Sequence, residues 1–179
     1  MIIKNKMKKK KEVLKYRMYG FVPYNISEIQ KAIQFGHAVV EYGLSYFNTS
    51  EYERWAWEDK TFIILNGGTT NETIQGEYMA SMNKTLAALK KNKIKYAAFY
   101  EPDLNDALSA IVFLVDERVY DKEKYPDFIF FRQGKFLKYE ETGGSQRIEY
   151  LKEYGIFEKN IGGKQNAFLR ELLSKARLA

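Results

Sequence analysis

Cysteine is absent from this sequence of 179 residues, and histidine occurs once, as His37. Without cysteine, a disulfide framework, a thiol nucleophile and a zinc site built on thiolates are all excluded. A single histidine leaves almost no room for a histidine-rich metal centre or for several catalytic histidines. We therefore expect neither a metal nor a cofactor.

Long apolar runs are also missing. No stretch of about 18 apolar residues occurs, which argues against a transmembrane helix. The basic N-terminus is not followed by the apolar run of roughly 7–15 residues that a signal peptide requires. We expect a cytoplasmic protein without a membrane partner. With 45% hydrophobic and 16% aromatic residues, the chain has enough apolar material for one well-packed domain.

Positive charge is concentrated at the two ends. Residues 1–18 carry eight cations against one acid, for a net charge of +7, and residues 159–179 carry five against one, for +4. The 140 residues between them sum to −5, although the whole chain is +6. We expect a lysine-rich, disordered arm over residues 1–15. It is either a solubilising tail or a phosphate-binding segment for RNA, through Lys8, Lys9, Lys10 and Lys11. The cations of residues 159–179, Arg170 among them, could extend these phosphate contacts.

Apolar periodicity indicates an α/β domain over residues 16–120. A strand at 16–23 is followed by a capping-box pattern, Ser27 with Gln30, and by a helix to about residue 47. We then expect a strand at 61–65, a helix at 77–92 and strands at 95–100 and 109–115. This order predicts a compact three-layer fold, with a mixed four-stranded sheet and helices on both faces.

Residues 121–179 are expected to form an extension packed on the same domain. A hairpin is predicted at 128–132 and 135–139, and a short helix at 146–154, ended by Gly155. The last segment, 166–178, has an amphipathic helical pattern that favours docking on its own domain. Use of this extension to bind a protein partner, or to form a homodimer, is the less favoured alternative.

The first helix carries a polar stripe. On a helical wheel Gln30, Gln34, His37 and Glu41 fall within about 60° of one another, and most of the remaining circumference is apolar. This predicts a central, buried helix whose stripe faces either a ligand cleft or buried hydrogen-bond partners. Glu41 lies four residues after His37 and could hold its imidazole in one tautomer. Lys31 is expected to point away from the stripe.

Residues 31–38 read KAIQFGHA, directly after the first strand. This segment resembles the signature of the type-II peptidyl-tRNA hydrolases, which has a lysine, small residues, a glutamine and then His-Ala on this helix. The general style of the sequence resembles phage-encoded relatives. The order of elements to about residue 120 is similar as well. The resemblance implies the family's compact α/β fold and hydrolysis of the ester between a peptide and tRNA.

The resemblance also implies site residues. Glu101 would replace the family's aspartate and orient or activate water, Lys31 would steady the oxyanion, and Gln34 and Asn105 would position the ester. His37 is a further catalytic candidate, and Gln30 and Glu41 are candidate substrate-binding residues. The sequence departs from the family in three places. Gln30 stands at the family's lysine position, the arginine of the loop has no counterpart, and residues 116–118 replace a glycine-rich end.

Two functions remain open at this point. The first is a peptidyl-tRNA hydrolase that recycles tRNA. The second is a catalytically inactive relative that binds protein or RNA, for example a phage protein acting on a host component. Residues 98–127 hold eight acids against three cations, which would repel a tRNA backbone. Magnesium binding by Glu101, Asp103 and Asp106 is a minor alternative.

Overall fold

The fold is built on a mixed sheet of four strands in the order β2-β1-β6-β5. This computed structural model describes residues 13–70, 73–74, 77–78, 80–132 and 134–179. The central strand β1 pairs in parallel with β2 and antiparallel with β6, and β6 pairs antiparallel with β5. The strands are β1 (Tyr16–Val22), β2 (Thr61–Asn66), β5 (Ala97–Glu101) and β6 (Ala107–Asp116).

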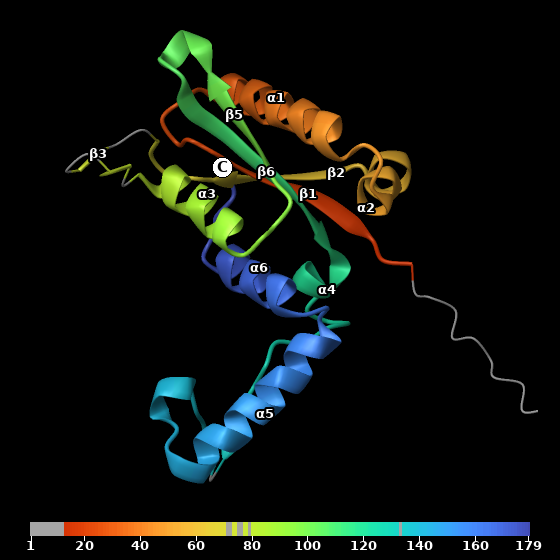
Figure 1. The fold of residues 1–179 in the computed structure, drawn as a ribbon, viewed down its shortest axis with the longest axis vertical. Helices are drawn as coiled ribbons and strands as arrows, with labels where there is room; N and C mark the ends of the chain where they lie inside the picture. The colour runs from red at the N-terminus through yellow and green to blue at the C-terminus, as the bar shows by residue number, and fades with distance from the viewer. Residues whose placement is uncertain (1–12, 71–72, 75–76, 79, 133) are drawn as a thin grey trace, which may run out of the picture.

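Helices cover both faces of this sheet, so the predicted three-layer α/β fold is confirmed (Figure 1). On one face lie α1 (Glu28–Tyr46), α2 (Ser50–Arg54) and a π-helical turn, Trp55–Asp59. On the other face lie α3 (Ser81–Lys91) and α6 (Lys164–Ser174). Each face has its own apolar core, with Phe35 and Tyr42 on the α1 side and Phe113 and Leu169 on the α6 side.

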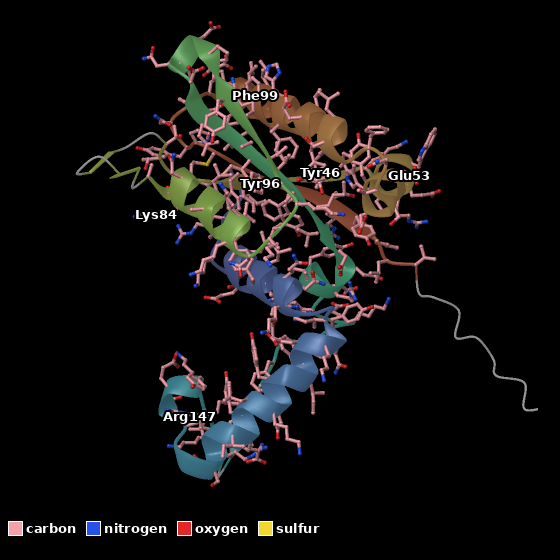
Figure 2. The ribbon with its side chains drawn as sticks, viewed as in Figure 1. Tyr46, Glu53, Lys84, Tyr96, Phe99 and Arg147 are labelled. Carbon is pink, nitrogen blue, oxygen red and sulfur yellow. The ribbon has the colours of Figure 1, made fainter. Side chains whose placement is uncertain are left out.

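Close packing of α1 depends on Gly20 in the middle of β1. A Cβ atom added there would lie 2.5 Å from the Phe35 ring and 2.8 Å from a Val112 methyl group. Only a glycine at position 20 therefore lets the Phe35 ring of α1 pack against β1. At the far end of the helix, Tyr46 lies beside Tyr96 (Figure 2), and its hydroxyl donates to the Tyr96 carbonyl at 3.3 Å.

The segment before α3 differs from the sequence prediction. Instead of a helix from residue 77, the chain forms a small hairpin of β3 (Thr73–Ile74) and β4 (Glu77–Tyr78), and α3 begins at Ser81. The reason is hydrogen bonding between the start of α3 and Thr69, a residue twelve positions before Ser81. The Thr69 amide donates to the Ser81 hydroxyl at 2.9 Å, and the Met82 amide donates to the Thr69 carbonyl at 3.0 Å.

The C-terminal residues complete the same fold. After α4 (Glu117–Tyr120), a short hairpin of β7 (Phe131–Arg132) and β8 (Lys135–Phe136) appears where it was predicted. A 3-10 turn (Tyr139–Glu141) leads into α5 (Gly144–Asn160), which extends away from the sheet in Figure 1. Aromatic rings hold this unit together, namely Phe128, Phe130, Tyr150, Tyr154 and Phe157.

The predicted docking of the last helix on its own domain is confirmed. Leu169 of α6 is buried in the core, and the residues after α6 pair with the edge of β2. The Asn66 amide donates to the Arg177 carbonyl at 2.9 Å, and the Ala179 amide donates to the Ile64 carbonyl at 3.1 Å. This pairing covers an otherwise open sheet edge.

Arg170 fastens α6 to the segment after β6. Its buried guanidinium donates to the Arg118 carbonyl at 3.0 and 2.7 Å, to the Tyr125 carbonyl, and to Asp127 at 2.9 Å. Burial raises the pKa of Asp127, but hydrogen bonds from Lys122 and Arg170 outweigh it and lower that pKa overall. Arg170 is therefore a structural residue and is not available to phosphate.

The lysines of the N-terminal arm, Lys8, Lys9, Lys10 and Lys11, lie outside the described residues. Within the described part of the chain, no helix is both long and apolar enough to cross a bilayer.

The end of α5 was predicted at Gly155, but the helix continues to Asn160 and is terminated by Gly162 and Gly163. Gly162 has a φ of +95°, and a Cβ atom there would lie 2.5 Å from Cζ of Arg118. Moving that guanidinium aside would break its two hydrogen bonds to Asp116. Around Gly155, by contrast, a Cβ atom would meet no heavy atom within 4 Å.

These two glycines give opposite expectations for the same substitution. Gly162→Ala should lower the free energy of unfolding by about 2 kcal/mol or more, through left-handed strain and the clash with Arg118. Gly155→Ala should raise it by roughly 0.5–1 kcal/mol, because alanine is the better helix former. Urea unfolding of both variants measures the difference. Equal effects would contradict the assignment of the helix end to Gly162.

Candidate functional site

Polar side chains from three elements meet between α1 and the sheet. Gln34 of α1 is 7% exposed, and its amide nitrogen donates to Oε2 of Glu101, at the end of β5, at 2.5 Å. Its amide oxygen accepts from the hydroxyl of Ser109, on β6, at 2.8 Å. Both ends of the amide are thus occupied, and Glu101 is held by a side chain that cannot rotate freely.

A β-bulge brings Ser109 to this place. In the pairing of β5 with β6, Phe99 faces Ala110 and Tyr100 faces Leu108, so Ser109 has no residue opposite it. Leu108 belongs to the core on the α3 side and Ala110 to the core on the α1 side. The side chains of the following residues alternate between the two faces of the sheet, and this alternation would turn Ser109 toward α3. The extra residue of the bulge shifts the alternation, so Ser109 faces α1 and reaches Gln34.

Lys31 lies on the same buried face, one turn before Gln34. It is 9% exposed, and its ammonium lies 2.9 Å from Oε1 of Glu28, whose own side chain is mostly in solvent. Lys31 does point away from the exposed residues of the predicted stripe, Gln30, His37 and Glu41, but it shares the buried face with Gln34, the stripe's fourth member. Residues three apart on a helix differ by only about 60° around the axis, and the buried face is centred on Lys31, Gln34, Phe35, Ala38 and Tyr42. Among the described residues, Glu28 is the one hydrogen-bond partner of the Lys31 ammonium.

The rest of the predicted polar stripe is not buried with Gln34. Gln30 is exposed and accepts from the Ser27 amide in the capping box, with a distance of 3.1 Å. His37 and Glu41 are exposed too, and no hydrogen bond between them occurs in the described structure. The outer side of α1 is open to solvent, so the expectation of a helix buried over most of its circumference is wrong.

His37 still lies beside the site. Its ring stacks on Phe99 of β5, with 4.6 Å between ring centroids and an interplanar angle of 20°. Phe99 lies between β5 and α1 (Figure 2), and its carbonyl is 3.2 Å from the Ser109 hydroxyl. One aromatic residue therefore separates the imidazole from the Gln34–Ser109 bond.

The loop after Glu101 is exposed and tightly turned. A 3-10 turn, Pro102–Leu104, precedes Asn105 and Asp106, both with a φ of +53°. Asn and Asp tolerate this left-handed region better than other residues with side chains do. Asn105 thus lies in the same turn as Glu101, with its side chain in solvent. Among the described residues no group of His, Asp and Glu could hold a metal ion, so the magnesium alternative has no support.

Several acids of the 98–127 region are paired within the protein. Asp127 lies 2.7 Å from Lys122, and Glu117, itself buried, lies 3.3 Å from Lys124. Buried Asp116 makes a bidentate pair with Arg118, at 3.0 and 2.8 Å. The three cations in these pairs are already counted in the net charge of −5, so the pairing fixes where the charge lies without reducing it. Among the described residues only Arg170, from outside the region, adds a compensating charge, at Asp127.

A polar cavity of about 270 Å³ lies at the opposite end of the sheet from Glu101, and sequence reasoning missed it. Its lining includes Lys93, Lys95, Asp116, Arg118 and Asn166. The Asn166 amide donates to Asp116 at 3.0 Å. Burial and the charge of Asp116 raise the pKa of Tyr16 at its rim. Asp116 and Arg118 form hydrogen bonds to each other, so we interpret the polar residues of this cavity as a structural network. We take the Gln34–Glu101 cluster as the candidate site.

Comparison of the chain with family models and with curated proteins gave no match. The assignment of function therefore depends on the residues of this chain.

The Gln34 network predicts a specific loss of stability. Ser109→Ala removes the donor to a buried amide oxygen and should lower the free energy of unfolding by about 1–2 kcal/mol. Ser145→Ala, an exposed serine on α5, is the matched control and should change it by less than about 0.5 kcal/mol. Chemical denaturation measures both. A Ser109→Ala variant as stable as its control would contradict the buried network.

Proposed function

We propose that this chain hydrolyses the ester that joins a peptide to tRNA, at a site centred on Glu101. The observation that carries the proposal is the hydrogen bond from the buried Gln34 amide to Glu101. A half-buried carboxylate held in one orientation at the end of a strand suits proton transfer. The resemblance of residues 31–38 to the signature helix of type-II peptidyl-tRNA hydrolases supports the same assignment.

In the proposed reaction Glu101 acts as the general base. Its carboxylate accepts a proton from a water molecule as the water oxygen attacks the ester carbonyl carbon. The tetrahedral intermediate then expels the ribose oxygen, which takes the proton back from Glu101 and leaves as the tRNA hydroxyl. Gln34 is a positioning residue in this scheme, because both ends of its amide are already bonded to Glu101 and Ser109.

The developing oxyanion needs a positive or hydrogen-bonding partner. Lys31 is the one lysine or arginine of α1 and lies one turn before Gln34 on the buried face, and its partner Glu28 is a solvent-exposed carboxylate that holds it weakly. Asn105 offers an exposed amide in the turn that follows Glu101. His37, exposed and stacked on Phe99, would contact the substrate beside the site.

The basic N-terminal arm would supply the phosphate contacts to tRNA, through Lys8, Lys9, Lys10 and Lys11. The net charge of −5 over residues 98–127 makes phosphate contacts by this part of the body unfavourable, which leaves them to the basic arm.

Glu101→Gln tests the proposal on a model peptidyl-tRNA. The variant keeps the shape of the side chain but cannot accept a proton, so kcat should fall at least about 100-fold. Asp103→Asn, an exposed acid in the same loop, is the matched control and should keep wild-type turnover. Absence of turnover by the wild-type protein at high concentration would refute the function. Wild-type activity in Glu101→Gln would remove Glu101 as the base.

A second candidate function is a catalytically inactive relative that binds a protein through its C-terminal residues. The observation in its favour is an apolar groove of about 420 Å³, whose lining includes Pro126, Phe128, Ile129, Ile156 and Phe157. Exposed apolar grooves of this kind mark interaction sites.

The second candidate predicts no hydrolysis and a binding activity that depends on the groove. Ile156→Glu should abolish capture of the partner in a pull-down from cell lysate, whereas Ile148→Glu, exposed on α5 outside the groove lining, should not. Recovery of neither protein nor RNA by the wild-type chain would count against it.

A further inference from the structure

The outer face of α1 carries a stripe of exposed apolar side chains. Ile29, Ile33, Val40 and Leu44 are 74%, 50%, 62% and 70% exposed, and Phe47 at the helix end is 65% exposed. At 100° per residue these positions fall within an arc of about 60°. They lie away from the sheet-facing residues Lys31 and Gln34. A soluble protein rarely leaves such a row uncovered on one helix.

Gly36 lies in the middle of this stripe, and no contact within the described part of the chain requires a glycine there. A Cβ atom added at Gly36 would meet no heavy atom within 4 Å. Glycine in a helix interior is unfavourable relative to alanine. Gly155 of α5 has equally open surroundings, but at Gly36 the bare backbone lies within an apolar row. A small residue on an apolar helix face allows the backbone of another helix to approach closely.

The stripe is self-complementary about the point between Gly36 and His37. If two copies of α1 run antiparallel across that point, Ile33 faces Val40 of the other copy, and Ile29 faces Leu44. Ile26, half-exposed just before the helix, then faces Phe47. Each apolar residue thus meets an apolar residue, as the isologous interface of a two-fold dimer requires.

Charge placement agrees with this pairing. The exposed charged side chains of α1 are both acidic, Glu28 and Glu41. They would repel their counterparts on the second copy if the pairing brought carboxylates close together. In the antiparallel pair Glu28 lies opposite Ser45 and Glu41 opposite Ala32. Each carboxylate therefore faces a small neutral residue of the second copy.

The area is sufficient for a weak dimer. Given the exposed fractions of these five side chains, the stripe offers roughly 300–400 Å² of apolar surface per copy. Because apolar atoms make up about 60% of an interface, two copies would bury roughly 1,000–1,300 Å² in total. This lies at the lower end of specific interfaces, the size range of weak and transient complexes.

We propose that the chain forms a two-fold homodimer through α1, with the helices antiparallel and crossing at Gly36. This goes beyond the proposed hydrolysis and is independent of it. The interface uses the outer side of α1, whereas Gln34 and Lys31 face the sheet. Two copies of the candidate site would therefore lie on opposite sides of the paired helices.

Light scattering on the full chain over a range of concentrations tests the dimer. The wild-type protein should approach twice its 21.0 kDa mass with a micromolar Kd. Val40→Glu would place a carboxylate against Ile33 of the other copy and should raise the Kd more than about tenfold. Ile148→Glu, a comparably exposed isoleucine on α5, is the control and should leave the Kd unchanged.

Gly36→Ala distinguishes close packing of the two α1 backbones from non-specific association through apolar side chains. The added methyl group should raise the melting temperature of the dilute monomer, since helix propensity improves and space is open. The same methyl group should weaken the dimer, because it holds the two helix backbones apart. An unchanged Kd in Gly36→Ala would overturn a crossing at this residue.

Disulfide trapping tests the register, since the natural chain has no cysteine. Ile29→Cys and Leu44→Cys proteins, mixed under a mild thiol oxidant, should cross-link to each other. Either variant alone should not, because its two cysteines would lie about 22 Å apart along the paired helices. Efficient cross-linking of either variant with itself, a monomer at all concentrations, or a dimer unaffected by Val40→Glu would each overturn the proposal. Binding of the monomer to lipid vesicles or to another protein through this stripe would do the same.

Discussion

Burial of β6 on both faces is the constraint from which the polar chemistry of this protein follows. From Ala107 to Phe113 the strand is covered by α1 on one side and by the α3 and α6 core on the other. Any polar side chain on it must find a partner inside the protein. Two do so, one near each end. Ser109 bonds Gln34 and so organises the site at Glu101, while Asp116 bonds Arg118 and Asn166 and so anchors the C-terminal residues.

Helix α1 has different tasks on its two sides. Its inner side supplies Lys31 and Gln34 to the candidate site and rests on the strand at Gly20. Its outer side carries apolar residues that the monomer leaves in solvent. Because apolar residues lie on both sides of α1, its helical wheel has the pattern that is typical of a buried helix. The polar residues between the two sides, Gln30, His37 and Glu41, consequently fall at the solvent boundary.

Much of the fold could be predicted from the sequence, because apolar periodicity and capping are local. The strands of the sheet, the Ser27 cap of α1, the hairpin after residue 128 and the docking of the last helix all follow from such patterns. Errors arise where distant contacts decide. The start of α3 depends on bonds to Thr69, and the end of α5 on Gly162 packed against Arg118 rather than on Gly155. In the candidate site, Gln34 and Glu101 are neighbours in the structure, whereas Asn105, Gln30 and Glu41 are not brought to the Gln34 amide.

The sequence by itself determined the class of fold, the absence of thiol chemistry and the separation of basic ends from an acidic body, since composition and periodicity need no knowledge of contacts. Only the tertiary structure decided that Ser109 belongs to the site, that Lys31 is buried beside Gln34, and that Arg170 is a structural cation. Each depends on a register or a packing distance between segments far apart in the chain. A bulge of one residue in β6 reverses which face a side chain meets, and no local pattern in the sequence encodes that shift.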